Sequence, residues 1–126
     1  MNAMAALKQY QTVNTHAQVG EASPHRLIQM LMEGGLSRLA QAKGAMLHGQ
    51  QAAKGELISK AIGIIGGLRE GLNLEQGGDL ATNLDRLYEY MVSRLVEANI
   101  ANDAQILDEV AGLLRNVKSG WDAISH

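Results

Sequence analysis

The sequence predicts an all-α protein built as an antiparallel four-helix bundle. Hydrophobic residues make up 46% of the chain, but only 3% of its residues are aromatic and phenylalanine is absent. An apolar core of Leu, Ile, Met and Ala favours helix over strand. Apolar residues also recur three and four positions apart along four segments of about 20 residues each. Short links separate these segments, and short links make consecutive helices antiparallel.

The first helix is expected to run from Ser23 to about Leu47. The only proline of the chain, Pro24, would occupy the first helical position, where a missing N–H costs nothing. The hydroxyl of Ser23 is suited to accept one of the free backbone N–H groups of that turn. The proline therefore marks a helix start and does not break a helix.

The segment before this helix contains few large apolar side chains, chiefly Leu7, Tyr10 and Val13. We therefore expect residues 1–22 to form a partly ordered N-terminal tail or a short helix. Residues 23–126 would form the four-helix bundle as a single domain, which is a usual size for one domain.

Glycine and asparagine or aspartate in the links delimit the other three helices. We expect the second from about Ala52 to Gly71, the third from a cap at Asp79 to about Asn99, and the fourth from a cap at Asn102 or Asp103 to about Ile124. Apolar residues of the fourth helix alternate in spacing between three and four, as in a bundle seam. They are Leu107, Val110, Leu114, Val117, Trp121 and Ile124. Trp121 is therefore expected to be largely buried.

The residue types needed for catalysis or metal binding are missing or unsuitably spaced. The chain has no cysteine, which excludes disulfides and zinc–thiolate sites and fits a reducing compartment. Among His16, His25, His48 and His126 no pair is spaced for a metal site on one helix, and no Glu-x-x-His motif occurs. We expect each histidine to be solvated. A phosphotransfer histidine would lie in mid-helix, whereas His25 and His48 lie near helix ends. The sequence thus predicts neither an enzyme nor a metal or cofactor.

Charge and hydropathy exclude two further classes of partner. The net charge is -2, so nothing indicates binding to nucleic acid or to an anionic membrane. No apolar run approaches the roughly 20 residues of a membrane span, so membrane insertion is not expected. The first residues also lack the pattern of a secretory signal.

Two features exceed what a plain bundle requires. Five of the six residues from Leu27 to Met32 are apolar, so apolar surface extends beyond one stripe. Glycines within predicted helices cost up to about 1 kcal/mol each relative to alanine. These are Gly34, Gly35, Gly44, Gly63, Gly66, Gly67, Gly112 and Gly120. Both features fit close packing inside the core, and both also fit an apolar groove that binds a second chain.

Several stretches, taken in order, resemble the FliS family of flagellar export chaperones. They are Tyr10, "ASPHRLIQMLMEGGLSRL", "KAIGIIGGLREGLNLEQGGDLATNLDRLYEYMVSRLVEAN" and "LDEVAGLLRNVKSGW". The resemblance extends from about Tyr10 to Trp121. Its most specific part is "NLDRLYEYM" with the preceding Gly-Gly.

The resemblance implies a cytoplasmic bundle that binds the disordered C-terminal segment of flagellin, prevents its premature polymerisation and presents it to the flagellar export gate. In the free protein the tail would cover part of the apolar groove. We place the partner contacts at Leu7, Tyr10, Met30, Leu31, Ile64, Leu68, Tyr90 and Leu95. We expect a monomer or a weak homodimer. An adaptor bundle that binds a different amphipathic helix is the alternative.

Overall fold

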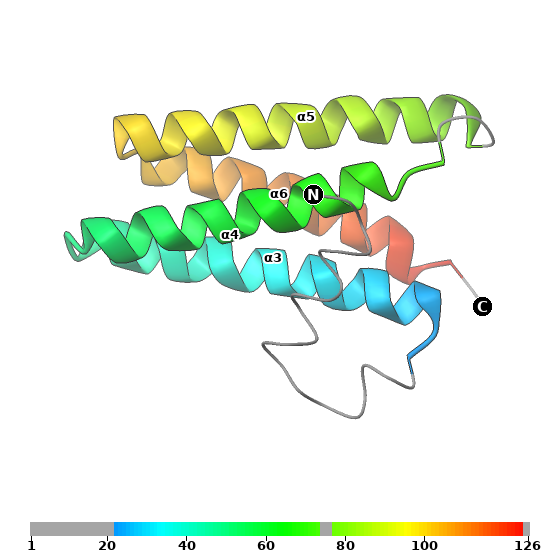
Figure 1. The fold of residues 1–126 in the computed structure, drawn as a ribbon, viewed down its shortest axis with the longest axis horizontal. Helices are drawn as coiled ribbons and strands as arrows, with labels where there is room; N and C mark the ends of the chain where they lie inside the picture. The colour runs from blue at the N-terminus through cyan, green and yellow to red at the C-terminus, as the bar shows by residue number, and fades with distance from the viewer. Residues whose placement is uncertain (1–21, 74–76, 125–126) are drawn as a thin grey trace.

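The computed structural model describes residues 22–73 and 77–124 of the chain. This part folds into four long helices, each antiparallel to the next (Figure 1). They are α3 (Pro24–Leu47), α4 (Gln51–Glu70), α5 (Gly78–Ala101) and α6 (Ala104–Asp122). The predicted all-α four-helix fold is confirmed. The predicted tail, residues 1–22, lies almost entirely outside the described residues, so the division into tail and bundle stays a prediction.

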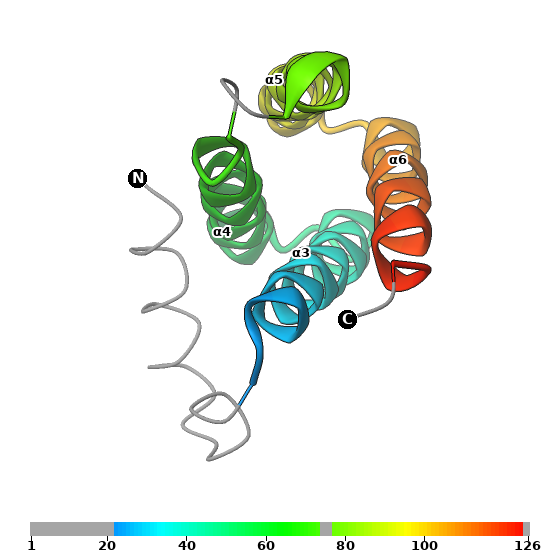
Figure 2. The same cartoon turned by 90° about the vertical axis from the view of Figure 1, so that its right-hand side faces the viewer.

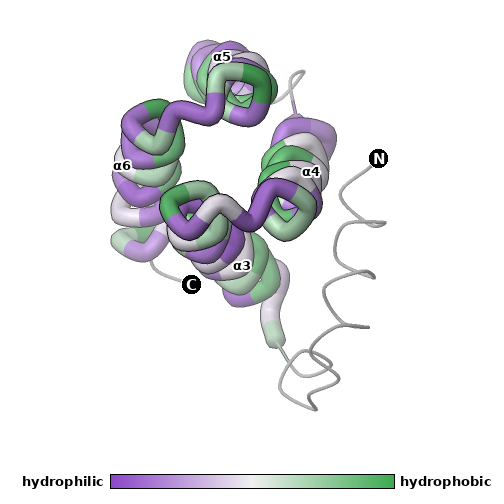
Figure 3. Tube along the Cα trace, turned by 90° about the vertical axis from the view of Figure 1, so that its left-hand side faces the viewer, coloured by the Kyte–Doolittle hydropathy of each residue, from purple (hydrophilic) through white to green (hydrophobic). Residues whose placement is uncertain are grey.

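The helices form a ring in which each one packs against two neighbours. Viewed along the bundle, the order around the ring is α3, α4, α5 and α6, and α6 returns to the side of α3 (Figure 2). Packing is most extensive between α3 and α4 and least extensive between α5 and α6. Hydrophobic and hydrophilic residues alternate along each helix, as expected for helices with one apolar side (Figure 3).

The core consists of aliphatic residues from all four helices, as the composition predicts. The bulkiest fully buried side chains are Leu31, Met32, Leu39, Ile58, Ile65, Met91, Leu95, Leu107, Val110 and Leu114. Tyr88 is also buried, whereas Tyr90 on the same helix is exposed. This difference agrees with the spacing of the third helix, in which Tyr88 falls on the apolar seam and Tyr90 falls beside it.

Two helix starts follow the predicted capping. The hydroxyl of Ser23 accepts the backbone N–H of Arg26 at 3.1 Å, with Pro24 in the first turn. The carboxylate of Asp103 accepts the N–H of Gln105 at 2.9 Å, which begins α6. These bonds satisfy donors that would otherwise lack an intrahelical partner.

The predicted cap of α5 is wrong. Asp79 lies within the first turn, and the N-cap is Gly77, which provides no side-chain hydrogen bond. Gly78, which follows the cap, adopts a positive φ of 59°, a conformation that is easy for glycine. An acidic residue in a first turn still interacts favourably with the positive end of the helix.

A buried lysine joins two helices at the end of the bundle that contains the α3–α4 and α5–α6 links, hereafter the turn end. The side chain of Lys54 on α4 is only 5% exposed. Its ammonium group donates to the carbonyl oxygen of Asn99 at 3.0 Å and to the side-chain oxygen of Asn102 at 3.1 Å. These oxygens lie at the C-terminus of α5, where free carbonyl groups favour a cation. Lys54 thus caps a neighbouring helix.

Candidate partner-binding site

An apolar cavity of about 550 Å³ lies at the opposite end of the bundle. We call it the end cavity. It opens where the first turns of α3 and α5 meet the last turns of α4 and α6. It is lined by Ile28, Met32, Leu68, Gly71, Leu72, Asn73, Gly77, Leu80, Ala81, Leu84, Tyr88, Asn116, Val117, Gly120, Trp121 and Ile124. All four helices therefore contribute to one apolar site.

The apolar lining of the end cavity continues to the molecular surface. Leu80 is 69% exposed and Ile124 is 46% exposed, and both border the cavity. Burial raises the pKa of the Tyr88 hydroxyl to about 12, so this lining residue is neutral at physiological pH. The lining itself contributes neutral side chains only, which suits apolar groups and offers a charged ligand no counter-ion.

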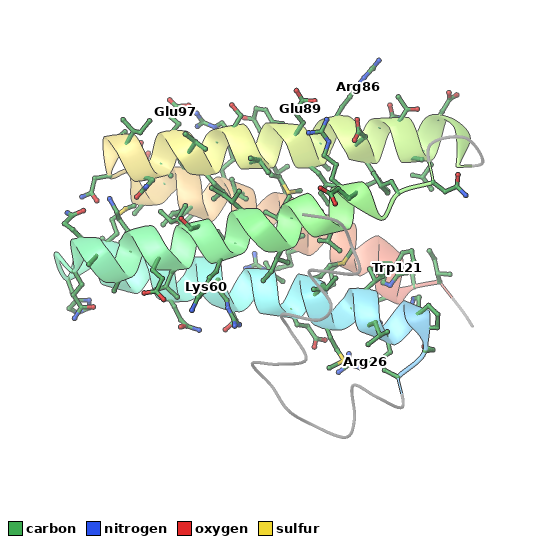
Figure 4. The ribbon with its side chains drawn as sticks, in the orientation of Figure 1. Arg26, Lys60, Arg86, Glu89, Glu97 and Trp121 are labelled. Atoms are coloured by element: carbon green, nitrogen blue, oxygen red, sulfur yellow. The ribbon has the colours of Figure 1, made fainter. Side chains whose placement is uncertain are left out.

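One residue of a stacked aromatic pair, Trp121, lines the end cavity, and its partner His25 lies outside the lining. His25 in the first turn of α3 stacks on Trp121 in the last turn of α6, with ring centroids 4.8 Å apart and an interplanar angle of 16°. The imidazole Nε2 lies 2.8 Å from the carbonyl oxygen of Trp121, and the indole Nε1 donates to the carbonyl oxygen of His25 at 3.0 Å. Figure 4 shows Trp121 at the end of the bundle where α3 begins.

This pair corrects one sequence-based expectation and refines another. His25 was expected to be solvated, but it is partly buried against the indole ring. Trp121 was expected to be largely buried, and most of its surface is indeed covered, while its ring also borders the end cavity. The apolar spacing of α6 correctly places Trp121 on the inner face, yet the neighbouring helices do not close over it completely.

Polar contacts join α3 and α6 beside the aromatic pair. The carboxylate of Asp122 accepts Gln29 at 2.7 Å and Lys118 at 2.7 Å. Lys118 also lies 3.8 Å from Glu33, which pairs with Arg26 at 3.1 Å. The hydrogen bond from Lys118 is the main cause that holds the pKa of Asp122 below its usual value, and the bond from Gln29 adds to it. This side of the end cavity, which we call the polar edge, is held by several bonds.

The side of the end cavity between α4 and α5 has an apolar rim, unlike the polar edge between α3 and α6. Its rim residues Leu72 and Leu80 are apolar. The interhelical ion pairs lie deeper along the bundle, where Arg69 contacts Asp85 at 2.7 Å and Glu89 at 3.0 Å. The end cavity is thus bordered by polar bonds on one side and by apolar side chains on the other.

For the helical glycines the sequence left two interpretations open, which are close helix packing and an apolar groove. Different glycines fit different interpretations. A Cβ atom on Gly35 would lie 3.1 Å from the side chain of Leu114, so Gly35 allows α3 and α6 to approach closely. At Gly44, Gly66, Gly112 and Gly120 a Cβ atom would meet nothing within 4 Å. Of these four, Gly120 lines the end cavity. Close packing therefore explains Gly35 and leaves these four without a packing role.

Four of the predicted partner contacts are buried, and three of them, Leu31, Leu68 and Leu95, belong to the core cluster. Met30, Leu31, Leu68 and Leu95 are buried, and of these Leu68 also lines the end cavity. A partner would reach Leu31 or Leu95 only if the helices moved apart, whereas Met30 is buried outside the core cluster. Their assignment to a binding groove stays a prediction.

The other four predicted contacts have different positions. Ile64 is partly buried and packs against the core. Tyr90 is 44% exposed, and its hydroxyl donates to Glu109 at 2.9 Å. Glu109 also accepts Arg94 at 2.7 Å, so Tyr90 belongs to a polar network between α5 and α6. Leu7 and Tyr10 lie outside the described residues, and their assignment also stays a prediction.

Sequence reasoning missed most of the end cavity. Its lining residues Ile28, Met32, Leu72 and Val117 carry the same apolar periodicity as the core, so spacing alone does not distinguish them. A usable signal was present in the third helix, where the apolar stripe begins at Leu80, immediately after the glycine link. A large apolar residue in the first turn after such a link lies near the end of a bundle, where fewer neighbours cover it.

The described residues show neither a membrane span nor a metal site. None of the helices within 22–73 and 77–124 combines the length and the hydropathy of a membrane-spanning helix. The same ranges contain no group of three or more His, Asp or Glu side chains that could hold a metal ion. What this part of the chain does present is an apolar cavity with neutral polar groups, a chemistry suited to binding apolar side chains.

Comparison with known proteins identifies the family. The family model described as flagellar protein FliS matches residues 6–126. The flagellar secretion chaperone FliSB of Pseudomonas aeruginosa is 68% identical over 126 residues, which is 100% of both chains. The flagellar secretion chaperone FliS of Salmonella typhimurium is 48% identical over 99% of this chain and 93% of its own. That of Vibrio cholerae is 47% identical over 94% of this chain and 88% of its own. The chain therefore belongs to the FliS family of flagellar secretion chaperones.

Proposed function

We propose that this protein is a cytoplasmic export chaperone that binds the disordered C-terminal segment of flagellin. The end cavity would receive apolar side chains of that segment. The bound segment could not take part in polymerisation, and the complex would be delivered to the flagellar export gate. The membership of the FliS family supports the export role, and the end cavity is the observation that supports apolar binding.

The volume of the end cavity suits this role. A site of about 550 Å³ falls in the range of cavities that bind ligands in proteins. Transfer of one large apolar side chain from water contributes roughly 1.5–3 kcal/mol. Ordering a disordered segment costs about 2–5 kcal/mol or more. Two or three inserted side chains are therefore needed before binding becomes favourable, and a longer amphipathic segment would supply further contacts outside the cavity.

The predicted contacts fit this proposal to different degrees. Leu68 belongs to the cavity lining, and Ile64 and Tyr90 are at least partly accessible. Leu7 and Tyr10 would cover apolar surface in the free protein and give way to the partner. Because Leu31 and Leu95 are fully buried, we now place the first contact of the segment at the end cavity.

The direct test is calorimetric titration of the protein with flagellin and with flagellin that lacks its C-terminal segment. Binding should require the segment, show a negative heat-capacity change and persist at high salt, since apolar contacts are not screened. Equal binding of the truncated flagellin would contradict the proposal. Failure of flagellin to bind, together with binding of another amphipathic helix, would favour the adaptor alternative.

The site itself can be tested with two matched substitutions on α6. Gly120→Leu would place a bulky side chain beside the end cavity, whereas Gly112→Leu would place it on the same helix away from the lining. Both positions have open space, and both changes raise helix propensity. We expect Gly120→Leu to weaken segment binding about tenfold or more, the equivalent of losing one buried side-chain contact. Equal affinities of the two variants would exclude the end cavity as the binding site.

A further inference from the structure

We infer that His25 is a positioning residue, which holds the indole ring of Trp121 as a fixed wall of the end cavity. We call the two residues the clasp. This inference rests on the proposed function, because it assigns to the clasp the role of keeping the cavity open for side chains of the bound segment.

The geometry of the clasp indicates a built contact between distant parts of the chain. Each residue supplies one side-chain group and one backbone carbonyl, so the two hydrogen bonds of 2.8 and 3.0 Å are reciprocal. A carbonyl oxygen only accepts, so the imidazole Nε2 carries a proton and donates. The partners are 96 residues apart, and the rings stack in addition. Three contacts therefore fix the position and the plane of the indole.

Trp121 needs such a restraint because of its place in the fold. It lies in the last turn of α6 and borders an apolar cavity on one side. An aromatic ring beside an unfilled apolar space gains dispersion contacts by turning into that space. The clasp opposes this rotation, since the indole N–H would lose its acceptor on His25 and the lining offers few alternatives. Without the clasp, we expect the ring to fill part of the end cavity.

Because of the polar edge, a substitution of His25 should change the position of the indole ring without unfolding the bundle. Gln29 on α3 binds Asp122 on α6, and Lys118 on α6 lies 3.8 Å from Glu33 on α3, so these contacts join the same two helices independently of the rings. Removal of the imidazole should therefore release the indole without separating α3 from α6. The test must therefore detect a movement of the Trp121 ring while the helices stay in place.

The test compares His25→Ala, His25→Gln and His48→Ala with the unchanged protein. His48 is a matched control, because its ring also hydrogen-bonds a helix carbonyl, at 2.7 Å from Gly44, but lies at the turn end. Glutamine retains an N–H donor on a side chain of similar length, so it should restore the bond without the stack. Trp121 is the only tryptophan, so tryptophan fluorescence excited selectively over tyrosine reports on the surroundings of this one ring.

We expect His25→Ala to shift the emission maximum of Trp121 and to change its quenching by acrylamide. We also expect it to weaken binding of the flagellin segment about five- to tenfold, the effect of losing one aromatic stack and one hydrogen bond. His25→Gln should recover part of this affinity, and His48→Ala should match the unchanged protein in both measurements. Circular dichroism should be the same for all four proteins.

Two results would overturn the inference. One is a His25→Ala variant whose tryptophan emission and quenching are unchanged, which would show that the imidazole does not hold the ring. The other is a changed Trp121 signal with unchanged affinity, which would show that the position of the ring does not matter for binding. Failure of the unchanged protein to bind the segment would instead refute the proposed function, while the fluorescence comparison would still decide whether His25 holds the indole.

Discussion

The two ends of the bundle are held together by different means. At the turn end the helix links are short, Asn102 adopts a left-handed conformation, and the ammonium group of Lys54 satisfies oxygen atoms at the C-terminus of α5. At the other end α5 begins at Gly77 without a side-chain cap, and Leu80 in its first turn is largely exposed. Exposed apolar side chains occur at both ends, Leu47 and Ile100 at the first and Leu80 and Ile124 at the second, but only at the second end do they border an apolar cavity.

This difference separates residues that stabilise the fold from residues available for binding. Each helix extends from one end of the bundle to the other. One helix can therefore carry the same residue type in the closed core and beside the end cavity. Leu95 on α5 is fully buried, whereas Leu84 on α5 borders the end cavity and is only partly buried. The two leucines lie on the same helix face and allow a matched comparison.

The largest expected effect is that of Leu95→Ala, which should lower the free energy of unfolding by about 2–5 kcal/mol, as in other well-packed cores. Leu84→Ala should cost less than about half as much, because the cavity already leaves part of its side chain without contacts. Urea unfolding of both variants measures the difference. Equal losses would show that the cavity end is packed as tightly as the rest of the core.

Lys54→Met tests the turn end more specifically. Methionine retains the buried stem but removes the ammonium group, so the oxygens of Asn99 and Asn102 lose their donor. Hydrogen bonds of this charged kind contribute about 1.5–3 kcal/mol, so we expect a loss of about 2 kcal/mol. The control is Lys60→Met on the same helix, where an exposed pair with Glu56 at 3.3 Å should contribute little. Similar free energies of unfolding for the two variants would show that the ammonium group of Lys54 does not stabilise the C-terminus of α5.

Much of the fold could be predicted because its signals are local. Ser23 and Pro24 mark the start of α3, and Asp103 marks the start of α6, through bonds to residues two or three positions away. The start of α5 was missed because its cap is Gly77, which makes no side-chain hydrogen bond, so no capping side chain marks it in the sequence. A capping side chain thus marks a helix start directly, although α4 begins at Gln51, close to the predicted Ala52, without such a cap.

The candidate site was harder to predict because its contacts are distant in sequence. His25 and Trp121 lie 96 residues apart, and neither shows from its own surroundings that it faces the other. Periodicity gives the inner face of each helix but not how far each helix extends past its neighbours. For that reason the spacing of apolar residues places both Leu31 and Leu84 on the inner face of their helices. Leu31 is nevertheless fully buried, whereas Leu84 borders the end cavity.

The smallest expected effect concerns the polar edge at low pH. The hydrogen bond from Lys118, supported by that from Gln29, lowers the pKa of Asp122 in the folded protein. In the unfolded chain an aspartic acid has a pKa of about 3.9. A lowered folded pKa means that the stabilising contribution is complete above the unfolded pKa and is lost as the pH falls through the folded pKa. Acidification from about pH 5 to pH 2 should therefore loosen the polar edge, and Trp121 fluorescence should follow this change.

The variant Asp122→Asn removes the titrating group while retaining a side chain that can accept a hydrogen bond. It should make the Trp121 signal less dependent on pH between about pH 4 and pH 2, because its amide does not ionise. An NMR titration of the Asp122 carboxyl group in the unchanged protein should give a pKa below the usual aspartic acid value. A pKa at or above that value would show that Lys118 and Gln29 do not hold the carboxylate in solution. The polar edge would then contribute little through Asp122, and the clasp, the Lys118–Glu33 pair and apolar packing would join α3 to α6 at this end.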